Sequence, residues 1–191
     1  MIRKAVGKAF FAMTGWTLEG GVPPVKKMVL IAAPHTSNWD FPYTIASAFG
    51  LELPIHWMGK HTLFEGPKGL LFRALGGIAI DRTKANNIVQ AMIDEMNARE
   101  EFFLVVPAEG TRKASAYWKS GFYHIARGAN VPIALAYLDF GKKRAGIGPL
   151  VYPTGDIKAD MDKIRAFYAE MSGKFPEKFT PPRLKEEGAV A

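Results

Sequence analysis

The feature that most constrains the fold is an alternation of short apolar runs with segments of helical periodicity. The segment EFFLVVP (101–107) is the strongest candidate for a buried strand. Strands that alternate with helices predict an α/β domain whose largely parallel, mixed sheet is flanked by helices. The expected strands span residues 28–33, 55–59, 78–81, 101–107, 131–140 and 144–152.

Helices are expected between these strands. Pro42 is tolerated only in the first turn of a helix, so it places one helix start close to residues 38–40. Thr83 can cap a long helix whose apolar positions share one face. The remaining helical segments are expected at 63–77, 120–129 and 160–173.

The length of 191 residues fits one domain. The segment GGVPP (20–24) separates a first helix from the rest of the chain. We therefore expect an amphipathic helical segment over 1–19, a main domain over 20–180 and a flexible tail over 181–191.

Composition narrows the classes of site and partner. The chain contains no cysteine, which excludes disulfides, zinc-thiolate sites and a cysteine nucleophile. Its formal net charge of +7 favours anionic partners such as phosphates, acidic lipid headgroups or an acidic carrier protein. Nucleic-acid binding would rest on charge alone, because no recognition motif accompanies it.

The first helix has two interpretations. Ile2, Val6, Phe10, Met13 and Trp16 recur at helical spacing beside several basic residues. This pattern is typical of a helix that lies in a membrane interface. The same pattern fits a helix packed on the core of its own domain.

A histidine and a carboxylate follow the first central strand. His35 comes just after the run 28–33, and Asp40 lies at the start of the next helix. A carboxylate bonded to one ring nitrogen fixes the tautomer and leaves the other nitrogen as a base. The alternative is that Asp40 only caps the helix and His35 is an ordinary turn residue.

Two later strand ends also carry polar clusters. Asp81 and Arg82 follow one strand, and the segment AEGTR (108–112) follows another. Glycine lets a backbone approach a ligand closely, and an arginine fork suits a phosphate. In a parallel sheet, sites gather at the carboxyl ends of the strands. An ordinary turn with a solvated ion pair remains the alternative for each cluster.

Taken in order, these motifs resemble those of the glycerophospholipid acyltransferases, of which the 1-acylglycerol-3-phosphate acyltransferases are the best-known members. The motifs are H-x4-D at 35–40, GGIAIDR at 76–82, EGTR at 109–112 and VPI at 131–133. Their order and spacing agree with the family over about residues 28 to 140. The segments WMGKHTLF (57–64) and WKSGFYHIA (118–126) look like those of short bacterial members.

The resemblance implies acyl transfer from acyl-CoA or acyl carrier protein to a hydroxyl of a lysophospholipid, without a metal or another cofactor. His35 would be the base and Asp40 its orienting carboxylate. It further implies peripheral contact with the inner, cytoplasmic face of the cell membrane. The residues implied in binding the acceptor or other anions are Arg82, Glu109, Gly110, Thr111, Arg112, Lys60 and Lys119.

The sequence departs from the family pattern at two places, and other readings stay open. Ala108 separates Pro107 from the glutamate, and the segment VPIALAY lacks a usual second proline. The acceptor could instead be another lyso-lipid, such as an aminolipid. A non-catalytic anion- or membrane-binding module would share the fold. A metal hydrolase would need His35, Asp40, His56 and His61, but no zinc-binding spacing is present.

Overall fold

The computed structural model describes residues 2–80 and 85–188. In this part of the chain, the strands form one sheet in the order β1–β7–β6–β2–β5–β3–β4. Strands β6 and β7 are antiparallel, and the other neighbours are parallel. This confirms the predicted α/β domain with a largely parallel, mixed sheet. The strands are β1 (Thr17–Glu19), β2 (Lys27–Ala33), β3 (Ile55–Lys60), β4 (Gly77–Ile80), β5 (Phe102–Val106), β6 (Ile133–Asp139) and β7 (Arg144–Val151).

The two central strands position the functional loops. Every residue of β5 is buried, as expected for a parallel strand covered on both faces. Ile31 of β2 pairs with Val106 of β5 near the carboxyl ends of both strands. The loops that follow β2 and β5 therefore leave the sheet side by side.

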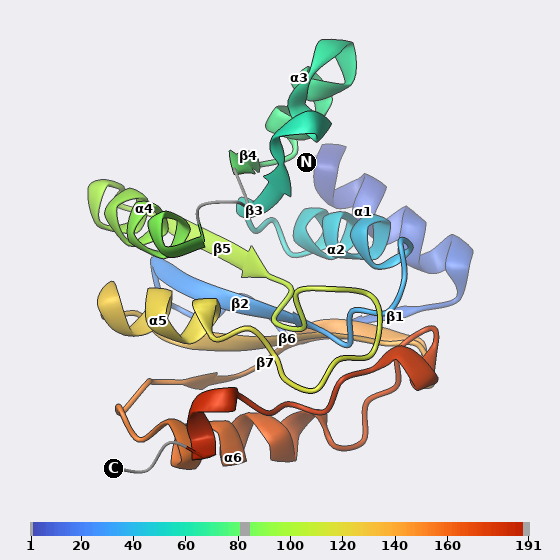
Figure 1. Ribbon diagram of the computed structural model, residues 1–191. Coiled ribbons are helices and arrows are strands. Elements are labelled where there is room, and N and C mark those ends of the chain that lie inside the picture. Colours follow the sequence, from blue (N-terminus) through green and yellow to red (C-terminus); the bar gives the residue numbers. More distant parts are fainter. Residues whose placement is uncertain (1, 81–84, 189–191) are drawn as a thin grey trace.

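Helices cover both faces of the sheet (Figure 1). On one face, Met28 and Leu30 of β2 pack in a cluster with Ala48 of α2 (Asp40–Gly50). On the other face, Val29 and Ile31 pack in a cluster with side chains of three helices. These helices are α4 (Ala85–Ala98), α5 (Gly121–Gly128) and α6 (Ile157–Tyr168). Asp81 and Thr83, the predicted strand end and helix cap, lie outside the described residues.

The first helix, α1 (Ile2–Thr14), packs on α2 through a face centred on Gly7 and Phe11. A Cβ atom on Gly7 would lie 2.5 Å from the backbone nitrogen of Gly50, so only glycine permits this approach. Ile2 and Val6 remain exposed. The helix ends before Gly15, whose φ is +69°, and residues 17–19 form β1 rather than the predicted helical segment.

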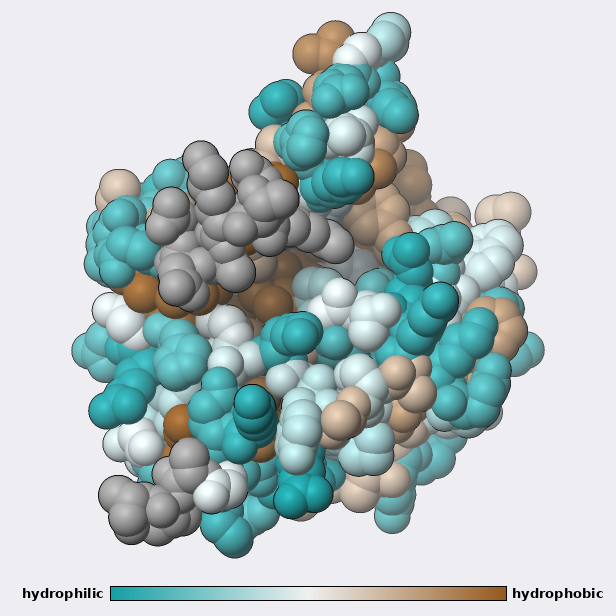
Figure 2. Space-filling view, viewed as in Figure 1, coloured by the Kyte–Doolittle hydropathy of each residue, from teal (hydrophilic) through white to brown (hydrophobic). Residues whose placement is uncertain are grey.

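A short arm joins β3 to β4. It consists of the 3-10 turn His61–Phe64 and α3 (Gly66–Ala74), and it projects from the body of the molecule (Figure 1). Leu70 is 75% exposed and Leu71 is 59% exposed. The surface of the arm mixes hydrophobic and hydrophilic side chains (Figure 2). The arm therefore carries apolar side chains that the domain does not cover.

The segment after α6 packs against the domain. Helix α6 begins earlier than the predicted residue 160, because the Asp156 side chain accepts a hydrogen bond from the Ala159 N–H at 3.0 Å. Leu184 is buried, and Arg165 forms an ion pair with Glu187 at 2.8 Å. Residues 181–188 of the predicted flexible tail are thus held by apolar packing and by an ion pair. The short 3-10 turns Pro176–Lys178 and Lys185–Gly188 lie in this segment.

Candidate active site

His35 and Asp40 meet at the carboxyl end of β2. Strand β2 ends at Ala33 and α2 begins at Asp40, so the intervening loop can turn the two side chains towards each other. The Nδ1 atom of His35 lies 3.1 Å from Oδ2 of Asp40. Asp40 is 3% exposed, whereas the His35 side chain keeps 20% of its surface accessible. A carboxylate at Nδ1 leaves Nε2, across the ring, as the nitrogen that can take up a proton.

Asp40 does not cap α2: Trp39 occupies the N-cap position, and no side chain of the described residues makes a cap hydrogen bond there. Asp40 is the first residue of α2, where its negative charge suits the helix dipole. Its Oδ2 atom accepts a hydrogen bond from the Ser37 N–H at 2.9 Å, so it also orders the loop ahead of the helix. Asp40 therefore organises the helix start while its carboxylate contacts the histidine ring.

A pocket of about 350 Å³ opens beside this pair. His35, Asp40 and Arg112 contribute its ionisable side chains. The part of its apolar wall that comes from α2, β3 and the arm consists of Phe41, Trp57, Met58, Leu63 and Phe72. The pocket thus joins a histidine–carboxylate pair and a guanidinium to a surface suited to a hydrocarbon chain.

The aromatic wall is the part of the pocket that sequence reasoning missed. The ring of Phe41 packs edge-on against Trp57 at 4.8 Å between ring centroids. The Trp57 indole N–H donates to the Leu75 carbonyl at 2.9 Å, which fixes the ring beside the arm. Trp57 belongs to the segment WMGKHTLF, so its aromatic residues were visible in the sequence, but their direction was not.

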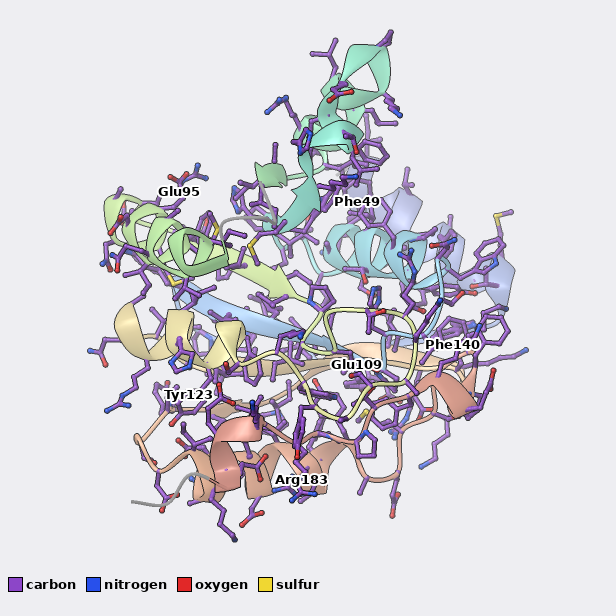
Figure 3. All side chains as sticks on the ribbon, in the orientation of Figure 1. Phe49, Glu95, Glu109, Tyr123, Phe140 and Arg183 are labelled. Carbon is purple, nitrogen blue, oxygen red and sulfur yellow. The ribbon has the colours of Figure 1, made fainter. Side chains whose placement is uncertain are left out.

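Glu109 belongs to the loop after β5, and it lies inside the molecule (Figure 3). It is fully buried, and its Oε1 accepts from the His35 backbone N–H at 2.5 Å. Its Oε2 accepts from the Thr180 N–H at 3.0 Å. Burial raises the pKa of Glu109 to about 7, although the two N–H donors oppose the shift. One carboxylate oxygen of Glu109 therefore binds the backbone of the candidate base itself, and the other binds the backbone of Thr180.

The rest of the EGTR segment is exposed. Gly110 has a φ of +69°, and a Cβ atom there would lie 2.6 Å from the Lys119 side chain. The Thr111 hydroxyl accepts from the Lys113 N–H at 3.3 Å. Arg112 reaches the lining of the pocket. Among the predicted binding residues that the structure describes, Arg112 thus shares the pocket lining with His35, Glu109 bonds to the His35 backbone, and Lys119 packs against the EGTR segment.

Two predicted residues remain, Lys60 and Arg82. Lys60 is exposed at the end of β3. It does not line the pocket, although Gly59 before it and Leu63 after it do. Arg82 lies outside the described residues.

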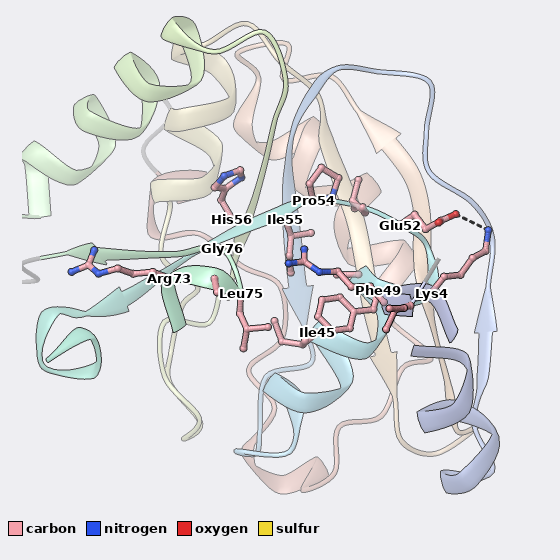
Figure 4. A pocket seen from close by; sticks show the side chains of 15 residues that line it. Lys4, Ile45, Phe49, Glu52, Pro54, Ile55, His56, Arg73, Leu75 and Gly76 are labelled. Atoms are coloured by element: carbon pink, nitrogen blue, oxygen red, sulfur yellow. Dashed lines mark hydrogen bonds and ion pairs between the residues drawn. The ribbon is translucent and has the colours of Figure 1, made fainter. Parts of the chain in front are cut away.

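A larger cleft of about 810 Å³ lies between α1, α2, the start of β3 and the end of α3 (Figure 4). Its walls are mainly apolar, and Lys4 pairs with Glu52 at its edge at 2.6 Å. Of the residues predicted for the acyltransferase site that the structure describes, none lines this cleft. Across residues 2–80 and 85–188, no three His, Cys, Asp or Glu side chains gather closely enough to hold a metal ion.

Comparison with known proteins identifies the family. The acyltransferase family model matches residues 18–137, which contain the His35–Asp40 pair and the EGTR segment. No curated protein matches the chain in sequence.

Among solved structures, the fold is similar to that of the 1-acyl-sn-glycerophosphate (LPA) acyltransferase PlsC from Thermotoga maritima. The TM-score is 0.60 at 18% identity, over 90% of this chain and 80% of that chain. The fold, the histidine–carboxylate pair and the family match over more than half of the chain lead to one conclusion: the chain belongs to the acyltransferase family.

Proposed function

We propose that this protein transfers a fatty acyl group from a thioester to the hydroxyl of a lysophospholipid, with 1-acylglycerol-3-phosphate as the favoured acceptor. One observation carries the proposal. The His35 ring, held by Asp40, lines the same pocket as the Arg112 guanidinium and an apolar wall. A base, an anion-binding group and a hydrocarbon surface are the three features that this reaction needs in one place.

In the proposed reaction, His35 Nε2 takes the proton from the acceptor hydroxyl as its oxygen attacks the thioester carbonyl. A general base of this kind contributes about 10²–10⁴-fold to the rate. The tetrahedral intermediate then collapses, the carbon–sulfur bond breaks, and the thiolate leaves. The proton held by the imidazolium goes to the thiolate, so the histidine returns to its neutral form. Asp40 keeps the imidazole in the required tautomer throughout.

The substrate assignment follows from the two sides of the pocket. Arg112 binds the acceptor's phosphate, because a guanidinium presents paired N–H donors to phosphate oxygens. The wall formed by Phe41, Trp57 and Phe72 accommodates an acyl chain. The donor is acyl-CoA or acyl carrier protein, since both present the acyl group as a thioester and both carry negative charge that a protein of net charge +7 attracts.

Peripheral contact with the cytoplasmic face of a membrane is part of the proposal. Ile2 and Val6 of α1 and Leu70 and Leu71 of α3 are exposed apolar side chains. Arg3, Lys4 and Lys68 lie on the same two helices and would attract anionic headgroups. In the described residues, no helix is both long and apolar enough to cross a bilayer.

The direct test is thiol release from palmitoyl-CoA and from palmitoyl acyl carrier protein against a panel of lyso-lipids. We expect turnover with 1-oleoylglycerol-3-phosphate and its loss in His35→Ala. Faster turnover with an aminolipid would make that lipid the favoured acceptor in place of 1-acylglycerol-3-phosphate. An absence of thiol release with every acceptor would instead support a non-catalytic binding module of the same fold.

A further inference from the structure

The chain after α6 crosses the catalytic edge of the sheet. Gly173 packs so tightly on the histidine loop that a Cβ atom there would lie 2.6 Å from the Thr36 hydroxyl oxygen and 3.2 Å from Cβ of Pro34. Two residues later, the Phe175 N–H donates to the same Thr36 hydroxyl at 3.2 Å. We call residues 173–184 the strap. Thr36 follows His35 directly, so the strap contacts the loop that carries the candidate base.

Thr180 is the second contact point of the strap. It is fully buried, and each of its hydrogen-bonding groups has a different partner. Its N–H donates to Oε2 of Glu109 at 3.0 Å. Its hydroxyl oxygen accepts from the Ser115 N–H at 3.0 Å, and its carbonyl accepts from the Trp118 indole N–H at 2.6 Å. Thr180 therefore binds the loop that carries Arg112 on both sides of that residue.

Glu109 links the His35 loop to Thr180 of the strap through two hydrogen bonds. One of its carboxylate oxygens accepts from the His35 N–H and the other from the Thr180 N–H. Buried polar atoms that lose their partners are costly, so these bonds favour one relative position of the strap and the two loops. The strap lies beyond residue 137, where the family match ends.

We propose that the strap is a positioning element for the proposed reaction: through Thr36 it sets the place of the His35 loop, and through Thr180 it sets the place of the Arg112 loop. The proposal rests on the proposed function, since it concerns the same two loops. Thr36 and Thr180 act through the residues that contact substrate and are therefore positioning residues.

The loss of each contact is expected to affect a different kinetic parameter. Thr180→Val keeps the shape of the side chain but leaves the Ser115 N–H without its acceptor. The Arg112 loop should loosen, so the KM for 1-oleoylglycerol-3-phosphate should rise about tenfold, with kcat and the palmitoyl-CoA KM within about twofold. Thr36→Val releases the strap from the His35 loop, so kcat should fall about tenfold with a smaller change in the acceptor KM.

Matched variants separate positioning from general stability. Thr180→Ser and Thr36→Ser keep the hydroxyl and should restore the kinetic parameters that the valine variants lose. A role in stability alone would lower Tm in the valine variants without the split between KM and kcat. Equal kinetic losses in the serine and valine variants would overturn the proposal. If Thr180→Val fails to fold, the Thr36 pair tests the strap at its other contact.

Hydrogen–deuterium exchange provides a readout that does not need turnover. Exchange should become faster over residues 108–119 in Thr180→Val and over 33–41 in Thr36→Val, and the serine variants should match wild type. Unchanged exchange in both segments of the valine variants would contradict the proposal. If wild-type protein turns over no lyso-lipid, the proposed function fails while the exchange pattern still decides whether the strap holds the loops.

Discussion

The cleft beneath α1 and the pocket beside His35 lie towards different ends of β3 and are built differently. The cleft is lined by Ile55 and His56 at the start of the strand and has a volume of about 810 Å³. The pocket is lined by Met58 and Gly59 nearer its end and has about 350 Å³. The larger hollow is also lined by charged side chains, including Arg73, but the ion pair at its edge, Lys4–Glu52, is exposed to solvent.

The smaller hollow is backed by two buried carboxylates, each of which contacts the His35 residue. Asp40 and Glu109 are both almost inaccessible, and each holds a part of the His35 residue. Such groups are costly to bury unless they are paired, so their presence indicates a requirement for fixed geometry. The comparison teaches that connected buried polar groups locate the candidate site, whereas volume alone would have selected the cleft.

The largest expected effect is on kcat, and it should distinguish His35 in the pocket from His56 in the cleft. His35→Ala removes the proposed base and should lower kcat by about 10²–10⁴-fold. His56→Ala is the matched control, because His56 stacks on Phe102 in the cleft region. Burial and the nearby Arg99 lower the pKa of His56, which favours its neutral form. The rate of thiol release is measured for both variants. Near-wild-type turnover of His35→Ala would show that His35 is not the base and that the pocket beside it is not the active site.

The second prediction compares the effects of replacing Arg112 in the pocket and Arg73 in the cleft on the acceptor KM. Arg112→Ala should raise the KM for the phosphate-bearing acceptor by about tenfold or more, since a charge-assisted hydrogen bond is lost. The KM for the acyl donor should change less. Arg73→Ala in the cleft is the control, because Arg73 packs over the Phe64 ring and lines the larger hollow. An unchanged acceptor KM in Arg112→Ala would remove Arg112 from the phosphate site.

The third prediction uses the buried carboxyl group. The pKa of Glu109 is about 7 in the folded protein, above its ordinary value of 4.5, because the group is buried. Between these pH values the folded state holds a proton that the unfolded state has released, so this contribution to stability is lost as the pH rises through 7. Relative to Glu109→Gln, wild type should lose up to about 3 kcal/mol of unfolding free energy from pH 4.5 to above 7.

Urea unfolding at several pH values checks this expectation. A difference between wild type and Glu109→Gln that stays constant with pH would show that Glu109 titrates normally. The accompanying loss of a bond to the His35 or Thr180 N–H should lower the stability of Glu109→Gln at every pH, and this constant offset does not affect the slope.

The smallest effect is expected at the edge of the cleft. Lys4→Ala breaks the ion pair with Glu52, whose pKa is lowered mainly by its hydrogen bond to Lys4. Exposed pairs contribute little to stability, so the thermal midpoint should match wild type within experimental error, as should turnover. A clear loss of stability would mean that the cleft carries a structural role comparable to that of the pocket.

Much of the fold could be predicted because its signals are local. The apolar run of β5 and the helical periodicity of α2 and α4 report burial directly, and Pro42 fixed a helix start to within a few residues. The spacing from His35 to Asp40 similarly indicated a contact that needs only one loop. The direction in which α1 packs was not predictable, because the close approach at Gly7 depends on the surface of α2.

The sequence by itself determined most of the strands and helices, with β1 as the exception, together with the family motifs and the short spacing that allows His35 to meet Asp40, because these signals are local. Only the tertiary structure decided that Glu109 points inward, that Phe41 and Trp57 form an apolar wall, and that the strap reaches both functional loops. Glu109 and Thr180 are 71 residues apart, and no local pattern encodes such a contact. It exists because folding places the end of α6 at the same edge of the sheet as the loops after β2 and β5.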